Sequence, residues 1–354
     1  MAVIGSAGYN VITGSRALAK LNSFLNKKKY SALFILCDEN TFLHCMPLLI
    51  IACPNLQQAH IIELESGEHS KHPDVCNMLW QTLADNSADR SSLLLNLGGG
   101  VISDVGGFCA SVYKRGIDFI NVPTSLLAMA DASVGGKTGI DFGGYKNMIG
   151  TFAQPQGVFV FPPFLETLPR RQLVNGMAEL YKIALVSDRQ FWQELSVGLT
   201  NTTFESQINK SIELKNKIVL KDPFDRSYRK ALNFGHTIGH ALEAQRLGSK
   251  HELLHGEAIM AGMITECHLA WQKKLISKKE LLEVSGFMKL RLHPKTGLLN
   301  FNELNSFLIH DKKAADRKLL FSLLRGIGNC KTDVLVTEKE IAKACDFFNA
   351  LVHD

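Results

Sequence analysis

In the first half of the chain, apolar segments of strand length alternate with segments in which apolar residues recur every three or four positions. The apolar runs predict strands at residues 32–37, 60–64, 92–97, 119–122 and 157–161. Residues 73–84 show helical spacing and begin at Pro73, a residue suited to a first helical turn. Strands separated by helices predict a parallel sheet covered by helices.

The second half of the chain has a different pattern, with long segments of helical spacing and few strand-like runs. Helices are predicted at residues 170–186, 207–219, 231–246 and 256–271. The change falls near residues 162–169, so we predict an α/β domain at 1–168 and a mostly helical domain at 169–354.

Composition places the chain among ordinary globular proteins: 354 residues, 46% hydrophobic and 21% charged. The net charge of +5 is small and spread along the chain, so nucleic-acid binding is not expected. Eight cysteines without a Cys-x-x-Cys pair predict buried, reduced thiols and a cytoplasmic location. The longest apolar run, near residues 46–53, is too short to span a membrane, and no export signal is expected.

A glycine-rich turn follows the predicted strand at 92–97. Gly98, Gly99 and Gly100 lead into a helix, where backbone amides can approach a pyrophosphate. Ser103 stands where the dinucleotide fingerprint has its third glycine, so a tight turn without a ligand stays open. A second run at 131–139 is similar to a P-loop, but residue 131 is not glycine, which argues against an ATPase.

Two histidines four residues apart, His236 and His240, share one face of a predicted helix. His255 opens the next helix, and Glu179 lies on a third. Two imidazoles and a carboxylate from separate helices are typical of a catalytic zinc site with one open position. A capping or core role for His236 and His240 remains the alternative.

Residues 251–255 also match the His-Glu-x-x-His pattern of zinc peptidases. Gly248 precedes this segment and Gly256 follows it directly, so it is predicted to be a loop that enters a helix. We therefore disfavour a peptidase and interpret His251 as an exposed loop residue. Among the basic residues, Arg115, Lys137 and Lys146 lie in glycine-rich or turn-forming segments, where a cation can be held against an anion.

Seven segments taken together resemble the dehydroquinate synthase family. In chain order they are 98–101 with Asp104, 113–116, 122–128, 131–138, 146–150, 233–237 and 311–313. The resemblance runs from about Asp38 to Lys313. It implies a Rossmann-like parallel-sheet domain that binds NAD, a helical domain that binds a divalent metal (usually zinc, with cobalt possible), and a homodimer.

The resemblance further implies conversion of 3-deoxy-D-arabino-heptulosonate 7-phosphate to 3-dehydroquinate and phosphate in the shikimate pathway. NAD oxidises a secondary alcohol, phosphate is eliminated, the ketone is reduced again, and the ring opens and closes by an aldol step. It makes Glu179, His236 and His255 the metal ligands and His240 an acid/base residue. The other catalytic positions implied are Lys137, Lys182 and Asp225.

The same resemblance assigns binding residues. Those implied for the substrate are Arg115 (from the partner subunit), Asp131, Lys137, Asn147, Lys182, Lys215, Arg229, Asn233 and one of Lys312 and Lys313. Those implied for NAD are Asp38, Asn40, Glu68, Lys71, Gly99, Gly100, Val101, Asp104, Thr124, Ser125, Lys137, Lys146 and Thr167. Acidic residues suit ribose hydroxyls and favour NAD over its 2′-phosphorylated form.

The chain departs from the family pattern at two points. Asp225 stands where the family usually has glutamate, which keeps the carboxylate and shortens its reach by one methylene. The loop between His240 and His255 is a few residues longer than usual, so His255 is assigned from its His-Gly-Glu context.

Three other functions are weighed against this one. Cyclases that make inosose or valiolone rings share the fold and metal site, but retention of residues 135–137 and 311–313 favours the shikimate enzyme. Metal-dependent alcohol dehydrogenases would not need so many anion-binding lysines. A non-catalytic relative would have a broken ligand set, whereas Glu179, His236 and His255 are all present.

Overall fold

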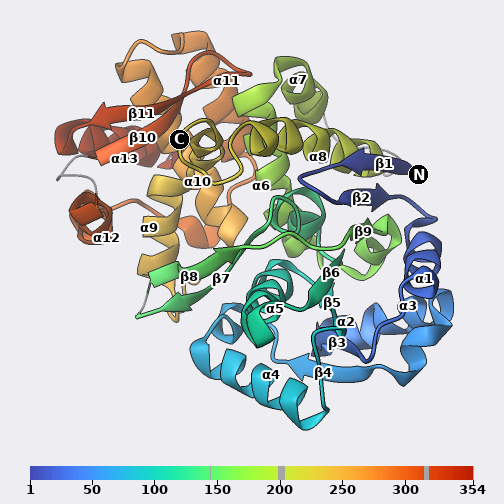
Figure 1. The fold of residues 1–354 in the computed structure, drawn as a ribbon. Helices are drawn as coiled ribbons and strands as arrows, with labels where there is room; N and C mark the ends of the chain where they lie inside the picture. Colours follow the sequence, from blue (N-terminus) through green and yellow to red (C-terminus); the bar gives the residue numbers. More distant parts are fainter. Residues whose placement is uncertain (144, 198–203, 315–318, 354) are drawn as a thin grey trace. The chain divides into compact units, whose positions relative to one another are not determined.

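The computed structural model describes residues 1–143, 145–197, 204–314 and 319–353, with side chains left out at 145 and 309–314 (Figure 1). The chain forms two compact units, which are described separately below. Unit 1 comprises Met1–Leu173 and Asn201–Asn216, and unit 2 comprises Val174–Thr200 and Lys217–Asp354. A single cut at residue 168 would not assign residues 201–216 to the first unit.

A seven-stranded sheet in the order β1-β2-β9-β6-β5-β3-β4 organises unit 1 (Figure 1). Its strands are β1 (Ala2–Gly5), β2 (Asn10–Thr13), β3 (Leu33–Asp38), β4 (His60–Leu64), β5 (Leu93–Gly98), β6 (Asp118–Pro123) and β9 (Val158–Val160). β1 and β2 are antiparallel, and every other pairing in this sheet is parallel. The five predicted strands are confirmed to within one residue at each end.

Three kinds of helix accompany this sheet in unit 1. The α-helices are α1 (Ala17–Lys27), α2 (Glu39–His44), α3 (Met46–Ala52), α4 (Pro73–Asp85), α5 (Gly100–Val112) and the first part of α8 (Phe204–Lys221). Short 3-10 helices are η1 (Pro54–Gln58), η2 (Glu68–Ser70), η3 (Tyr113–Arg115) and η5 (Pro162–Thr167), and η4 (Ala128–Ala132) is a π-helical turn. α5 lies so close to β5 that a Cβ on Gly106 would be 1.9 Å from Oδ1 of Asn96. This close approach aims the start of α5 at the carboxyl end of β5.

The sequence does not predict a hairpin that packs on α5, formed by β7 (Lys137–Phe142) and β8 (Tyr145–Phe152). Gly139 and Gly150 face each other across it, and a Cβ on Gly150 would be 2.3 Å from the Thr138 carbonyl oxygen. Glycine allows this close pairing but weakens the apolar alternation that identifies a strand. For this reason the glycine-rich pattern did not predict the two strands of the hairpin.

Unit 2 is mostly helical and is built around α10, which is buried from Gly256 to Ala270 and packs against α9, α11 and α13 (Figure 1). Its helices are α6 (Arg170–Ser187), α7 (Arg189–Val197), the end of α8, η6 (Tyr228–Asn233), α9 (His236–Arg246), α10 (His255–Gln272), α11 (Lys278–Lys289), η7 (Pro294–Thr296), α12 (Phe301–Ala314) and α13 (Glu338–His353). β10 (Leu319–Leu324) and β11 (Cys330–Val336) form an antiparallel hairpin.

The predicted continuous helix at 231–246 is wrong. The 3-10 helix η6 ends at Asn233, and α9 begins only at His236. Between them Gly235 adopts a left-handed conformation with φ 81°, which ends the helical path. Periodicity alone could not show this break, because the apolar spacing continues through it.

Close contact between α9 and α10 depends on glycine. A Cβ on Gly262 would be 2.0 Å from the carbonyl oxygen of Gly235, and a Cβ on Gly239 would be 2.7 Å from Cδ1 of Ile259. The two helices can approach this closely only because these positions have no side chain. The first turns of α9 and α10 are thereby held in a defined relation.

We expect Gly262→Ala to lower the free energy of unfolding by about 1–3 kcal/mol, because the added methyl group would overlap the Gly235 carbonyl. Gly286→Ala is the matched control, since nothing lies within 4 Å of its Cβ position in α11. That control should raise stability by about 0.5–1 kcal/mol, because alanine loses less backbone entropy in a helix. Chemical denaturation measures both, and equal effects would contradict the packing argument.

None of the helices in the described part of the chain is both long and apolar enough to cross a lipid bilayer. All eight cysteines are free thiols, and seven of them are buried.

Candidate active site

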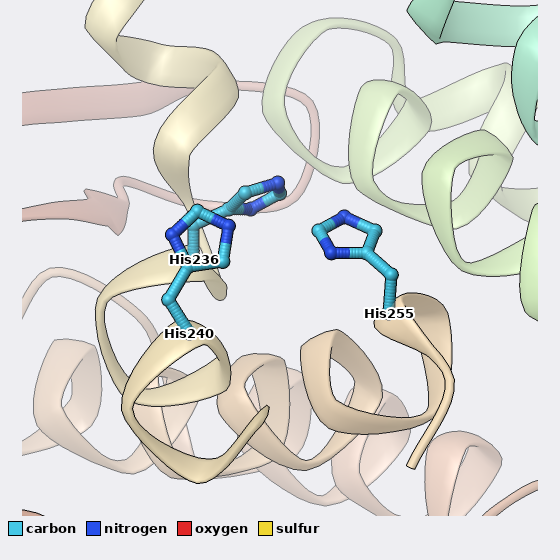
Figure 2. A group of neighbouring side chains, drawn as sticks. All are labelled: His236, His240 and His255. Atoms are coloured by element: carbon cyan, nitrogen blue, oxygen red, sulfur yellow. The ribbon is translucent and has the colours of Figure 1, made fainter. Parts of the chain in front are cut away.

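Three imidazoles converge in unit 2 (Figure 2). His236 is the first residue of α9, His240 lies one turn later, and His255 is the first residue of α10. One nitrogen from each ring lies within 4.8 Å of the others, and the ring centroids are 5.0–5.7 Å apart. Such spacing leaves room for one cation among the rings.

The carboxylate of Glu179 joins this cluster from α6. Its Oε1 lies 3.3 Å from Nε2 of His255 and 3.7 Å from Nε2 of His236, and its side chain is 1% exposed. Lys182, also buried, forms an ion pair with Oε2 of Glu179 from the next turn of the helix. The structure thus brings together the three residues predicted as metal ligands, with His240 and Lys182 beside them.

Asn175 ties α6 to the start of α10. Its Oδ1 accepts a hydrogen bond of 2.5 Å from the backbone N–H of Gly256, and a Cβ on Gly256 would be 2.0 Å from the Asn175 carbonyl oxygen. Because Asn175 precedes Glu179 by one turn and Gly256 follows His255, this contact sets the carboxylate beside the imidazole.

The Nδ1 atoms of His236 and His255 each lie close to a hydrogen-bond acceptor. Nδ1 of His236 lies 3.1 Å from the carbonyl oxygen of Phe234, and Nδ1 of His255 lies 3.3 Å from Oε2 of Glu243. With a metal ion bound, a proton kept on each Nδ1 would leave each Nε2 free to act as the ligand on the Glu179 side, as in carboxylate–histidine–metal arrangements. Sequence reasoning missed Glu243, although its place seven residues after His236 puts it on the same face of α9.

The electrostatics of the cluster suit a divalent cation. Burial, together with the charge of Lys182, lowers the pKa of His236 well below its usual value, so this imidazole is neutral. Burial would also lower the pKa of His255, but Glu243 and Glu179 outweigh it and raise the value to about 10. Buried carboxylates that stabilise a proton on His255 would equally stabilise a metal ion in its place. The donor set therefore fits zinc or cobalt.

The predicted substrate residue Arg229 lies at the start of η6, and Asp222 binds the backbone of the segment that leads into this helix. The carboxylate of Asp222 accepts backbone hydrogen bonds from Arg226 (3.0 Å), Ser227 (2.7 Å) and Arg229 (3.1 Å). Arg229 is buried, and its Nη1 donates to the carbonyl oxygen of Pro223 at 3.0 Å. Sequence reasoning missed this role of Asp222, which orients the segment that carries Asp225 and Arg229.

Stability should depend on pH through Asp222. Backbone donors, first that of Arg226, lower its pKa from 3.8 to about 2 in the folded protein. A lowered pKa stabilises the fold above the unfolded value near pH 4, and this contribution is lost as the pH falls towards 2. We expect Asp222→Asn to be less stable than the parent at pH 7, with the difference shrinking below pH 4. Denaturation at several pH values measures this, and a constant difference would contradict it.

In unit 1 the predicted glycine-rich turn joins β5 to α5. Gly99 is the N-cap of α5, and Thr124 donates its backbone N–H to the carbonyl oxygen of Gly98 at 3.0 Å. A Cβ on Gly99 would lie 3.4 Å from Oγ of Ser125. Gly99, Gly100 and Val101 are half-buried at the start of α5, and the backbone amides of a helix start suit a phosphate.

Lys71 connects two other predicted residues. Its Nζ donates to Oδ2 of Asp104 at 2.8 Å and to Oδ1 of Asn147 at 2.6 Å. Burial would lower the pKa of Lys71, but the charge of Asp104 outweighs it and raises the value. The lysine therefore stays charged and links α5 to the β7–β8 hairpin.

Two more ion pairs join predicted residues in unit 1. Nζ of Lys146 lies 3.2 Å from Oε2 of Glu68. Lys215 pairs with the carboxylate of Asp131 and also donates to its backbone carbonyl oxygen at 2.6 Å. Lys215 therefore belongs with Asp131, whereas Arg229 and Asn233 lie in η6 of unit 2.

The remaining predicted residues are dispersed over both units. Asp38 caps α2 by accepting the backbone N–H of Thr41 at 2.8 Å. Asn40 donates to Glu39, and Thr167 donates to the Phe164 carbonyl oxygen. Arg115, Lys137 and Asn233 are exposed. The side chains of Lys312 and Lys313 lie outside the described part of α12.

The segment 251–255 is not a helix, since α10 begins only at His255 and His251 is exposed in a turn. The interpretation of His251 as a loop residue is confirmed, and its ring does not join the three-imidazole cluster in the described residues.

Comparison with known proteins gives matches to two family models. Residues 61–175 match the model described as 3-dehydroquinate synthase N-terminal, and residues 176–314 match 3-dehydroquinate synthase C-terminal. The chain belongs to the 3-dehydroquinate synthase family. The resemblance inferred from the sequence is thereby confirmed.

Members of the 3-dehydroquinate synthase family align along almost the whole chain. The 3-dehydroquinate synthase of Parabacteroides distasonis is 38% identical over 336 residues, 93% of this chain and 95% of the relative. That of Streptococcus gordonii is 34% identical over 346 residues, 94% of this chain and 95% of the relative.

A related fold is seen in solved structures. One is 2-epi-5-epi-valiolone synthase from Streptomyces hygroscopicus with NAD⁺ and Zn²⁺ bound, at 25% identity and TM-score 0.86, covering 99% of both chains. Another is 2-deoxy-scyllo-inosose synthase with carbaglucose-6-phosphate, NAD⁺ and Co²⁺, at 24% identity and TM-score 0.86, covering 97% of this chain and 99% of the other. The predicted α/β fold with a helical second half is confirmed.

Proposed function

We propose that the chain is a 3-dehydroquinate synthase, a lyase that converts 3-deoxy-D-arabino-heptulosonate 7-phosphate to 3-dehydroquinate and phosphate. The observation that carries the proposal is the convergence of Glu179, His236 and His255 in a chain of this family. The intact cluster argues against a non-catalytic relative.

Two cofactors complete the proposal: NAD, and a divalent ion, Zn²⁺ or Co²⁺, held by Glu179, His236 and His255. When bound, the nicotinamide accepts and returns a hydride, and the metal acts as a Lewis acid towards substrate oxygens. Both cofactors are named for the valiolone synthase whose fold this chain resembles.

The protein's own residues then handle protons and anions. His240 lies beside the proposed ligands and would accept and return the proton of the hydroxyl being oxidised, with Asp225 as a second proton acceptor. Lys182 lies against Glu179 and would hold substrate oxygens near the cluster. Buried Arg229 would bind the substrate carboxylate, because its planar guanidinium matches a planar anion.

The remaining residues sort into three binding groups. We assign NAD to Asp38, Asn40, Glu68, Lys71, Gly99, Gly100, Val101, Asp104, Thr124, Ser125, Lys137, Lys146 and Thr167. We assign the substrate phosphate to Arg115, Lys137, Asn147 and one of Lys312 and Lys313, and other substrate contacts to Asp131, Lys215 and Asn233. The α5 first turn supports the first group, since a helix start favours pyrophosphate.

We further propose a cytoplasmic homodimer in which Arg115 of one subunit serves the other. The buried free thiols support a reducing compartment, and the exposed position of Arg115 on η3 leaves it accessible to a partner. Mixing Arg115→Ala chains with Glu179→Ala chains tests the sharing. Recovery of activity in mixed dimers is expected, and no recovery would argue against it.

Phosphate release from the heptulosonate phosphate by chelator-stripped protein tests the function. We expect release only when NAD and Zn²⁺ are both added, without net NADH, because the hydride returns within each turnover. Net NADH would indicate a dehydrogenase. No release would indicate a cyclase for another sugar phosphate.

A further inference from the structure

Glu266 is a fully buried carboxylate in the middle of α10, 0% exposed and outside the set of proposed ligands. Its Oε2 accepts the backbone N–H of Gly235 at 2.6 Å, and its Oε1 accepts that of Ile238 at 3.1 Å. Burial raises its pKa to about 8, so the backbone donors offset only part of the cost of desolvation. Because both of its oxygens bind backbone amides of another helix, the geometry indicates a structural task.

That task concerns the start of α9. Gly235 is the N-cap of this helix, and having no side chain it provides no capping group. Glu266 accepts from the N-cap and N3 amides, the pair that a capping box normally satisfies. The cap therefore comes from α10, a different helix.

Position matters here because His236 is the first residue of α9, between the two amides that Glu266 holds. First turns of helices fray when their amides lack acceptors. His240 lies one turn after His236 on α9. His255 is the first residue of α10, the helix that carries Glu266. The Glu266 carboxylate thus connects the first turn of α9, which carries His236, to α10, which begins with His255.

We propose that Glu266 is a positioning residue for the metal site, which holds the first turn of α9 so that His236 meets Glu179 and His255. The inference rests on the proposed metal site. It predicts that the loss of this acceptor weakens metal binding more than it weakens the fold.

The test compares Glu266→Gln with Glu280→Gln in the full-length apo protein. Glu280 is the control, because it also accepts two backbone amides, that of Ser277 (2.9 Å) at the N-cap of α11 and that of Ile327 (3.3 Å) in the turn between β10 and β11, and α11 carries no proposed ligand. Zn²⁺ affinity is measured by competition with a chromophoric chelator. The ligand-field absorption of bound Co²⁺ reports the geometry, and thermal unfolding reports stability.

We expect Glu266→Gln to bind Zn²⁺ about 10- to 100-fold more weakly and to alter the Co²⁺ spectrum, with Glu280→Gln unchanged in both. Glu266→Asp, which keeps the carboxylate and retracts it by one methylene, should lie between the parent and Glu266→Gln. Affinity and spectrum equal to those of the parent in Glu266→Gln would overturn the proposal. If Glu266→Gln does not fold, an unchanged Glu266→Asp overturns it. A separate variant, His255→Ala, tests the metal site itself. If it bound Zn²⁺ as tightly as the parent does, the proposed metal site would be refuted.

Discussion

Glu179→Gln is expected to abolish tight zinc binding and to slow phosphate release by about 10³-fold, since losing several kcal/mol of charge stabilisation has that effect on a rate. The side chain is 1% exposed and lies 3.3 Å from Nε2 of His255. Glutamine has nearly the same shape but no negative charge. The substitution therefore tests charge with little change in packing.

The expected loss has a clear physical cause. The ammonium of Lys182 and the two imidazoles surround this carboxylate away from water. Without it, a divalent ion would meet a cationic lysine in a buried site, which is strongly unfavourable.

Metal content and phosphate release are measured together. Glu283→Gln is the control, because this exposed glutamate lies on α11 in the same unit, where it accepts the Trp192 indole N–H at 2.8 Å. It should leave both quantities unchanged. Full zinc content in Glu179→Gln would show that this carboxylate is not a ligand.

The second large effect is expected for His240→Asn: kcat falls about 10²- to 10⁴-fold while the zinc content is kept. Geometry alone leaves two roles for this histidine, because its ring nitrogen lies within 4.8 Å of those of His236 and His255. Substitution of a metal ligand and substitution of an acid/base residue have different effects on the zinc content. Removal of a ligand releases the metal, whereas removal of a proton carrier slows the reaction only.

His236→Asn provides the contrast and should lose both zinc and activity. His251→Asn is the neutral control, because this exposed turn residue is outside the cluster. If His240→Asn released zinc as readily as His236→Asn, His240 would be a ligand and another group would carry the proton.

Periodicity was a good guide to the parallel sheet, because β3, β5, β6 and β9 are buried on both faces and form continuous apolar runs. β3, β4 and β5 lie within one residue of the predicted limits. It failed where glycine or short length removes the signal, as at β1, β2 and the β7–β8 hairpin. It also failed at Gly235, where one left-handed residue divides an apparently continuous helix.

In the candidate site, too, some residues could be predicted from the sequence and others could not. The motif residues Glu179, His236 and His255 could be predicted as a group because the family resemblance spans the chain. Glu243 and Glu266 were not predicted, because Glu243 meets His255, and Glu266 meets the backbone of Gly235, only after α9 packs on α10. The available signals were the place of Glu243 seven residues after His236 and that of Glu266 within the apolar run of α10.

The sequence by itself determined the class of fold, the family, and the kinds of side chain available for metal, nucleotide and anion binding, since these depend on residue type and local spacing. Only the tertiary structure decided which carboxylate faces which imidazole, that Lys71 bridges Asp104 and Asn147, and that α9 is capped from another helix. The physical reason is that hydrogen bonds and ion pairs act over about 3 Å. Residues distant in sequence reach that range only when packing brings their helices, strands and loops together.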